Sequence, residues 1–183
     1  MSGAERRRGQ HTATLRSRWK LGLLVVAVLG AAIVAWQVGP VRTVELVEVP
    51  EPKLEGLGES DQDQLRNLIA ELDRAHAEGT GIGPAYGQLG RAYLAYDFHA
   101  PAEAAFTNAT QLDPEEPAWP YLRGETIQQT GRLEDAAAAY ERTVRTWPDL
   151  IPARVHLAEV YLDLGRTAEA ETMLTQVLSA DPD

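Results

Sequence analysis

The sequence predicts an all-α protein in which one apolar helix near the N-terminus precedes a stack of helical hairpins. Three observations support this fold class. Residues 21–41 contain no charged residue, and the sequence resembles itself at an offset of 34 residues from residue 83 onward. Apolar residues also recur at helical spacing after residue 60. The 183 residues, of which 44% are hydrophobic and 24% charged, have the composition of a folded protein.

Charge is distributed unevenly along the chain. Residues 1–20 carry six basic residues and one acidic residue, whereas residues 42–183 carry eleven basic and twenty-six acidic residues. An acidic domain repels nucleic-acid phosphates, so we expect no nucleic-acid partner. The sequence contains no cysteine, which excludes disulfides and thiolate chemistry.

The apolar segment over residues 21–41 predicts a transmembrane helix, since about 20 apolar residues in a helix cross a bilayer. Basic residues dominate the preceding flank, residues 1–20, and acidic residues dominate the following one. Because basic flanks stay in the cytoplasm, we expect a cytoplasmic tail, a single-pass anchor in a bacterial-type inner membrane, and a periplasmic (extracytoplasmic) remainder. A cleaved signal peptide is the alternative, although its best cleavage site, Gly30–Ala32, lies inside the apolar segment.

Two connecting segments follow the predicted anchor. Residues 42–59 are rich in proline, glycine and acidic residues, which predicts an extended linker that acts as a spacer. Ser60 then predicts the N-cap of an amphipathic helix over residues 61–77. With the glycine-rich turn after it, this helix occupies residues 60–82, and we expect it to cap the first repeat.

The internal repeat has recurring small, aromatic and proline positions. Gly90, for example, aligns with Gly124 and Ala158. This period and these residue types resemble the tetratricopeptide repeat (TPR) family. The first unit matches the family pattern at eight positions: Tyr86, Leu89, Gly90, Tyr93, Ala102, Phe106, Ala109 and Pro114. The resemblance implies an α-solenoid of about three TPR helical hairpins, over residues 83–116, 117–150 and 151–183.

The second unit departs from the family pattern in its first helix. Pro120 and Arg123 occupy positions where the family has an aromatic residue and leucine, while Trp119 and Leu122 lie one residue earlier. Proline is tolerated in the first turn of a helix. We therefore expect this helix to start late or to be rotated.

The third unit stops one residue short of the repeat length. Leu174, Val177 and Leu178 would then lack a covering helix. We expect one of three outcomes: a partner covers them, the chain forms a homo-oligomer, or the sequence belongs to a longer array.

In the family, the first helices of the hairpins line a concave peptide-binding groove. The positions that point into it are, in this sequence, Arg91, Leu94, Tyr121, Glu125, Gln128, Gln129, Val155, Glu159, Leu162 and Asp163. Glu125 and Glu159 stand where carboxylate-gripping relatives place basic or amide side chains, so they would repel a terminal carboxylate. We hypothesise a basic protein or peptide partner with an apolar anchor. The alternative is that these residues are only the solvated face of three helices.

These features predict a membrane-anchored TPR scaffold that mediates protein–protein interactions outside the cytoplasm, in an assembly or chaperone-like role. The alternative is a non-catalytic subunit or regulator of a membrane-bound enzyme or of cytochrome c maturation. No enzyme is predicted, because the four histidines show no metal-ligand spacing and no nucleophile motif accompanies them. We expect no metal and no cofactor. The glycosylation sequon at Asn108 is interpreted as incidental, because it lies inside a predicted helix.

Overall fold

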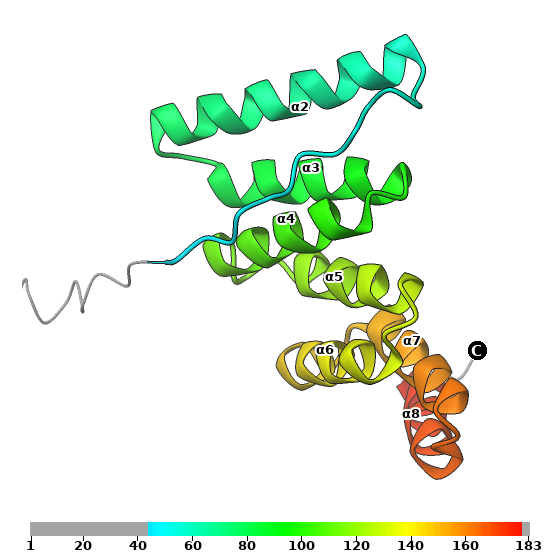
Figure 1. Ribbon diagram of the computed structural model, residues 1–183. Coiled ribbons are helices and arrows are strands. Elements are labelled where there is room, and N and C mark those ends of the chain that lie inside the picture. Colours follow the sequence, from blue (N-terminus) through cyan, green and yellow to red (C-terminus); the bar gives the residue numbers. More distant parts are fainter. Residues whose placement is uncertain (1–43, 181–183) are drawn as a thin grey trace, which may run out of the picture. The chain divides into compact units, whose positions relative to one another are not determined.

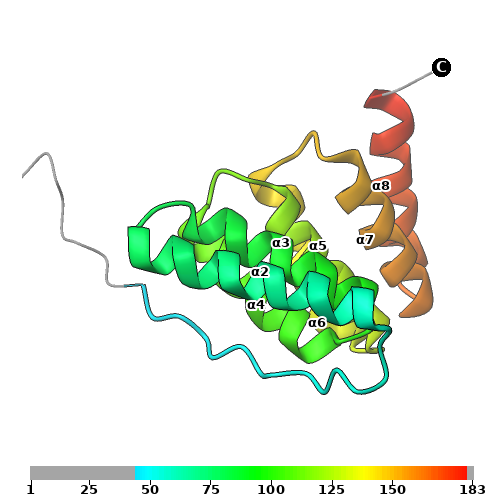
Figure 2. The same ribbon diagram turned by 90° about the horizontal axis from the view of Figure 1, so that it is seen from above.

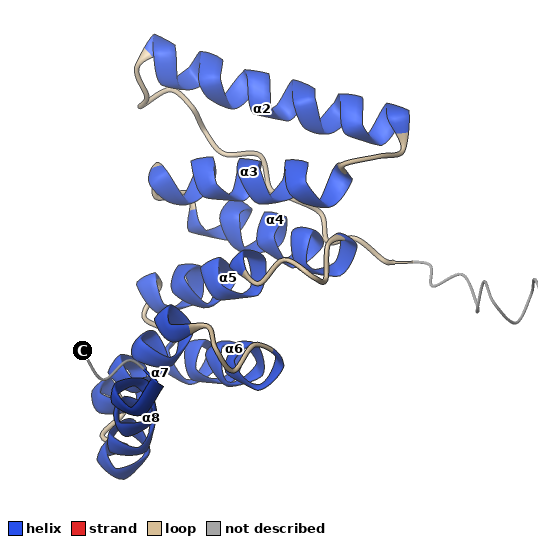
Figure 3. Cartoon of the chain, turned by 180° about the vertical axis from the view of Figure 1, so that it is seen from behind, coloured by secondary structure: helices blue, strands red, loops and turns tan. Residues whose placement is uncertain are grey.

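A computed structural model describes residues 44–180, which form seven α-helices and no strand (Figures 1 and 3). The helices are α2 (Glu59–Glu78), α3 (Ile82–Ala95), α4 (His99–Leu112), α5 (Ala118–Gln129), α6 (Leu133–Thr146), α7 (Ile151–Asp163) and α8 (Thr167–Ala180). The predicted tail and transmembrane helix, residues 1–20 and 21–41, lie outside the described residues. Among the described helices, none combines the length and apolar character needed to cross a membrane.

The helices after α2 pair into three hairpins, α3–α4, α5–α6 and α7–α8, and each hairpin packs on the next (Figure 1). The turn inside each hairpin uses a left-handed residue at the same repeat position. These residues are Asp97, Gly131 and Gly165, with φ of 61°, 75° and 73°. Left-handed φ suits glycine and is tolerated by aspartate. The described part is therefore an α-solenoid, as the sequence predicts.

A glycine facing an aromatic ring sets the close crossing within the first two hairpins. A methyl group at Gly90 would lie 2.8 Å from Phe106 Cε1, and one at Gly124 would lie 2.7 Å from Tyr140 Cε1. Such distances are too short for two carbon atoms, so only glycine lets these helices approach this closely. In the third hairpin the aromatic position holds Leu174, which is 38% exposed.

The start of α5 follows from the displaced tryptophan of the second unit. The helix begins at Ala118, after Pro117, and Trp119 is only 4% exposed. A methyl group at Gly87 of α3 would lie 2.5 Å from the Trp119 ring. The indole Nε1–H donates to Asp113 Oδ2 at 3.1 Å. Trp119 thus joins the second hairpin to the core of the first.

Helix α2 covers the first hairpin, but its predicted N-cap is wrong. The helix starts at Glu59, after Gly58, and no side chain caps it. A backbone turn from Leu57 N–H to Leu54 C=O, at 3.0 Å, leads the chain into the helix before Ser60 is reached. Two buried side chains, Leu65 and Leu72, face the first core.

Residues 44–57 contain no helix or strand and end in the turn at residues 54–57, yet they pack on the first hairpin instead of forming the free spacer that their composition predicts. We call this segment the strap. Leu46, Val49, Leu54 and Leu57 pack in half-buried positions against the first core. Figure 2 shows the strap running beside α2 and α4. Its half-buried residues Leu46, Val49 and Pro52 recur every three residues, as in an extended chain with three residues per turn, and the residues between them are exposed. One side of the segment therefore docks while the other faces solvent.

Asn108 of α4 fixes the strap through the backbone of Val47. The Val47 N–H donates to Asn108 Oδ1 at 2.8 Å, and Asn108 Nδ2 donates to the Val47 carbonyl at 2.8 Å. Asn108 is completely buried. Its side chain is therefore a structural clamp, which agrees with the interpretation of the sequon as incidental.

Candidate protein-binding face

The predicted groove residues divide into three groups in the structure. Helices α5 and α7 bring Tyr121 and Glu159 to one surface, where they meet Tyr140 of α6 and His156 of α7. The members of this surface, which we call the acidic aromatic face, are Tyr121, Glu125, Gln128, Tyr140, His156 and Glu159. Tyr140 is completely buried beneath this face, in agreement with the core position that the family pattern gives it. His156 was not among the predicted contacts, because the pattern assigns it no groove position.

Three rings form the centre of the acidic aromatic face. The Tyr121 ring lies 6.2 Å from the Tyr140 ring and 5.6 Å, edge to face, from the His156 ring. The Tyr140 and His156 rings stack with centroids 5.8 Å apart. Aromatic pairs at these separations hold each other in fixed positions. Tyr121 and His156 are half-buried, so part of this platform contacts solvent.

Burial, with a smaller contribution from the nearby carboxylates, raises the pKa values of the two tyrosines of this face. Burial, and then the negative charges of Glu125 and Glu159, raise the pKa of Tyr121. Burial is also the larger cause for Tyr140, and together with the same two carboxylates it raises the pKa of Tyr140 far above its ordinary value. The neutral Tyr140 hydroxyl donates to Gln128 Oε1 at 3.0 Å. This hydrogen bond ties Gln128 Oε1 to the core.

The negative charge of this face has little local compensation. Within residues 44–180, Glu125 takes part in no ion pair, and its Oε1 only accepts a 3.4 Å hydrogen bond from Gln129. Glu159 Oε2 lies 3.4 Å from His156 Nδ1, although the geometry does not make a hydrogen bond and Nδ1 is buried without a partner. A cation beside Glu125 and Glu159 would be attracted by both charges.

The N-terminal members of the predicted groove, Arg91 and Leu94, lie on α3. The Arg91 guanidinium stands over the Trp119 ring, 5.3 Å from its centroid, and Leu94 packs against the first core. Arg91 is thus held by a cation–π contact. The sequence could not show this pairing, because it depends on the displacement of Trp119 by one residue. The groove expected to run along all three hairpins is therefore not one uniform acidic surface.

The C-terminal members of the predicted groove are more open. Leu162 is 51% exposed, and Asp163 is exposed beside it at the end of α7. Val155 is half-buried. Tyr161, in contrast, is turned to the other side, where its hydroxyl donates to Glu141 Oε1 at 3.0 Å and burial, with Glu141, raises its pKa to about 12. Leu162 remains as an exposed apolar side chain that a ligand could cover.

The stacked hairpins and the exposed face on their first helices define a helical-repeat scaffold. Two family models, both described as tetratricopeptide repeat, match the chain, one over residues 88–151 and the other over residues 128–183. The chain belongs to the tetratricopeptide repeat family. Proteins of this family bind other proteins or peptides.

Curated relatives share the repeats with this chain but are much longer. The TPR repeat-containing thioredoxin TTL4 of Arabidopsis thaliana is 36% identical over 76 residues, which are 42% of this chain and 11% of that protein. Superkiller complex protein 3 of Homo sapiens is 32% identical over 106 residues, which are 57% of this chain and 7% of that protein. The chain spans about a tenth or less of the length of these relatives.

Solved structures of MamA have the same fold. A crystal structure of MamA superposes with a TM-score of 0.52 at 21% identity and covers 66% of this chain and 80% of that chain. The MamA RS-1 ArsTM double mutant reaches a TM-score of 0.59 at 20% identity, covering 71% and 72% of the two chains. At these identities the similarity concerns the fold alone.

Proposed function

We propose that this protein is a membrane-anchored scaffold that binds basic segments of other proteins on the extracytoplasmic side of the membrane. The observation that carries the proposal is the pair Glu125 and Glu159 beside a half-buried aromatic platform, without a neutralising arginine or lysine within residues 44–180. A Lys or Arg of a partner finds two carboxylates there and a ring face for its aliphatic stem. Leu162 offers an apolar contact on the same helix as Glu159.

Charge reversal on the acidic aromatic face tests the binding part of the proposal. The double variant Glu125→Lys/Glu159→Lys of the full chain is compared with Glu134→Lys/Glu171→Lys, which changes two exposed carboxylates on α6 and α8 by the same charge. We expect the first variant to bind a Lys/Leu-alternating peptide at least about tenfold more weakly in fluorescence anisotropy, because attraction becomes repulsion. The control variant should change the affinity by no more than about twofold, because its two substitutions lie away from the acidic aromatic face. Equal affinities of the two variants would contradict the proposal.

The membrane part of the proposal rests on the uncharged residues 21–41 and the basic residues before them. The natural chain has no cysteine, so single cysteines report topology without background. In intact bacterial cells, a membrane-impermeant maleimide that passes the outer membrane should label Ser179→Cys. Ser2→Cys should be labelled only after the inner membrane is opened. Labelling of both sites in intact cells, or of neither, would contradict the topology.

A further inference from the structure

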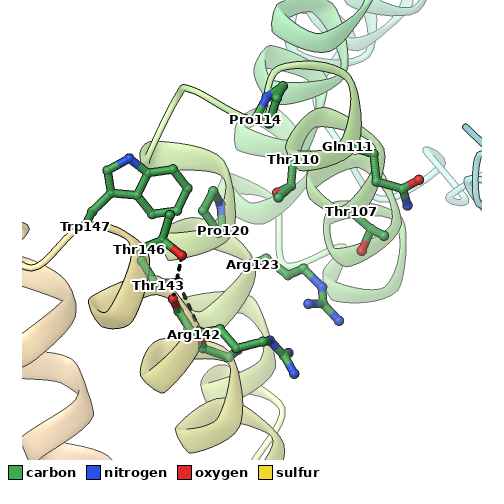
Figure 4. A pocket seen from close by; sticks show the side chains of 11 residues that line it. Thr107, Thr110, Gln111, Pro114, Pro120, Arg123, Arg142, Thr143, Thr146 and Trp147 are labelled. Carbon is green, nitrogen blue, oxygen red and sulfur yellow. Dashed lines mark hydrogen bonds between the residues drawn. The ribbon is translucent and has the colours of Figure 1, made fainter. Parts of the chain in front are cut away.

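A second candidate site lies on another side of α5. A cavity of about 420 Å³ opens between α4, α5 and α6 (Figure 4). Pro114, Pro120 and Trp147 supply apolar walls, and Arg123 and Arg142 supply positive charge. Along α5, Pro120 and Arg123 stand more than a quarter turn away from Tyr121 and Glu125, so the cavity is separate from the acidic aromatic face.

The two arginines of this cavity are incompletely neutralised. Arg123 Nη2 lies 3.7 Å from Glu103 Oε1, but Glu103 also pairs with Arg132. Arg123 Nε is buried without a hydrogen-bond partner. Arg142 takes part in no ion pair within residues 44–180. Burial, partly opposed by Glu103 and reinforced by Arg142, lowers the pKa of Arg123, which agrees with a shortage of negative charge here.

The same repeat position in the first hairpin is already filled by an extended segment. Arg142 is the counterpart, 34 residues on, of Asn108, and Pro120 is the counterpart of Tyr86. Asn108 holds the Val47 backbone of the strap with two hydrogen bonds of 2.8 Å. The strap continues along α3, where its Glu51 raises the pKa of Tyr93, after burial as the larger cause. The chain therefore contains its own example of how this surface of a hairpin accepts an extended peptide.

The substitutions between the two positions change which peptide fits. Asn108 offers one donor and one acceptor, which match a peptide N–H and C=O. Arg142 offers donors only, and Arg123 adds a second guanidinium where the first hairpin has Leu89. Guanidinium groups beside proline and tryptophan walls suit a carboxylate next to an apolar side chain.

We propose that the cavity between α4, α5 and α6 binds an extended segment of a partner protein in which acidic and apolar residues alternate, in the way that the strap occupies the first hairpin. Arg142 and Arg123 bind its carboxylates, and Pro114, Pro120 and Trp147 cover its apolar side chains. This proposal does not depend on the acidic aromatic face, which selects the opposite charge.

The test uses a labelled peptide with the sequence of residues 44–52, which is extended in the strap and carries three glutamates. The strap of the full chain competes for the first hairpin at a millimolar effective concentration, so micromolar peptide does not displace it. We expect saturable binding in fluorescence anisotropy, and at least tenfold weaker binding of the peptide in which the three glutamates are replaced by lysine.

The variant Arg142→Glu should weaken binding of the acidic peptide about tenfold, because an attractive charge becomes repulsive. Arg145→Glu is the matched control, since it places the same charge change on an exposed residue of α6 that does not line the cavity. Glu125→Lys/Glu159→Lys should leave this binding intact, which separates the outcome from that of the proposed function. The proposal would be overturned if binding of the acidic peptide did not saturate, or if the lysine peptide bound with the same affinity as the acidic one. It would also be overturned if Arg142→Glu and Arg145→Glu weakened binding equally.

Discussion

The first and second hairpins have a corresponding surface at the repeat position of Asn108 and Arg142, but only in the first hairpin does the strap cover it. Asn108 in α4 is completely buried under Val47, whereas its counterpart Arg142 in α6 is exposed beside an open cavity. One repeat scaffold therefore serves as an internal docking surface in the first unit, whereas no segment within residues 44–180 covers the corresponding surface of the second unit. The second helices, α4 and α6, keep the same bounds relative to the repeat, whereas α5 starts two residues later than α3, as the position of Trp119 and Pro120 predicts. The difference in the surface lies mainly in a few side chains.

The hairpins also differ in how they are held together. In the first, Gly90 and the fully buried Phe106 form an apolar crossing. In the third, the aromatic position holds the partly exposed Leu174, and Tyr161 reaches back to Glu141 of the second hairpin by a hydrogen bond. Buried apolar contacts in the first hairpin are thus partly replaced by polar contacts at the surface in the third. We expect stability to fall along the stack.

The largest effect should come from removing the aromatic residue of the first hairpin. Phe106→Ala leaves a cavity next to Gly90 and should lower the free energy of unfolding by about 3–5 kcal/mol. Leu174→Ala, at the same position of the third hairpin, should cost about 1 kcal/mol or less, because Leu174 is 38% exposed. Urea unfolding followed by circular dichroism measures both losses. Comparable losses would show that the two hairpins are packed equally well.

A smaller effect should follow from releasing the strap. Asn108→Ala deletes both hydrogen bonds to Val47 and should lower the free energy of unfolding by about 2 kcal/mol. Arg142→Ala, the matched change in the second hairpin, should alter it by no more than about 0.5 kcal/mol. Hydrogen exchange of the Val47 amide reports the release directly. Unchanged protection of this amide in Asn108→Ala would mean that the clamp does not hold the strap.

The repeat spacing predicts the hairpins because a 34-residue period fixes where small and large side chains recur. Gly90 and Phe106, for example, are both recognisable from the sequence and meet in the structure. The docked strap could not be predicted in this way. Its prolines and glutamates indicate a linker, and its docking depends on the tertiary position of Asn108, which carries no sequence signal except its place inside a helix.

The candidate site was predicted only in part for a similar reason. The resemblance to the tetratricopeptide repeat implies that Tyr121, Glu125 and Glu159 lie on the first helices of neighbouring hairpins, and the structure brings them to one surface. The stacking of His156 on Tyr140 depends on how α6 and α7 pack, which periodicity within one helix does not determine. The cation–π contact of Arg91 with Trp119 likewise depends on the packing of α3 and α5, and the part of Arg91 in the groove stays a prediction.

The comparison between the covered and the open hairpin surfaces is tested most directly by mapping the acidic peptide on the full chain with amide chemical shifts. The account predicts that the largest shift changes occur at Arg142, Thr143 and Trp147, around the cavity of the second hairpin. The amide of Val47, in the strap, should not move. The account would be contradicted if the largest shift changes centred on Val47 and Asn108, or on Glu125 and Glu159. The peptide would then bind at the strap or at the acidic aromatic face, and not at the cavity of the second hairpin.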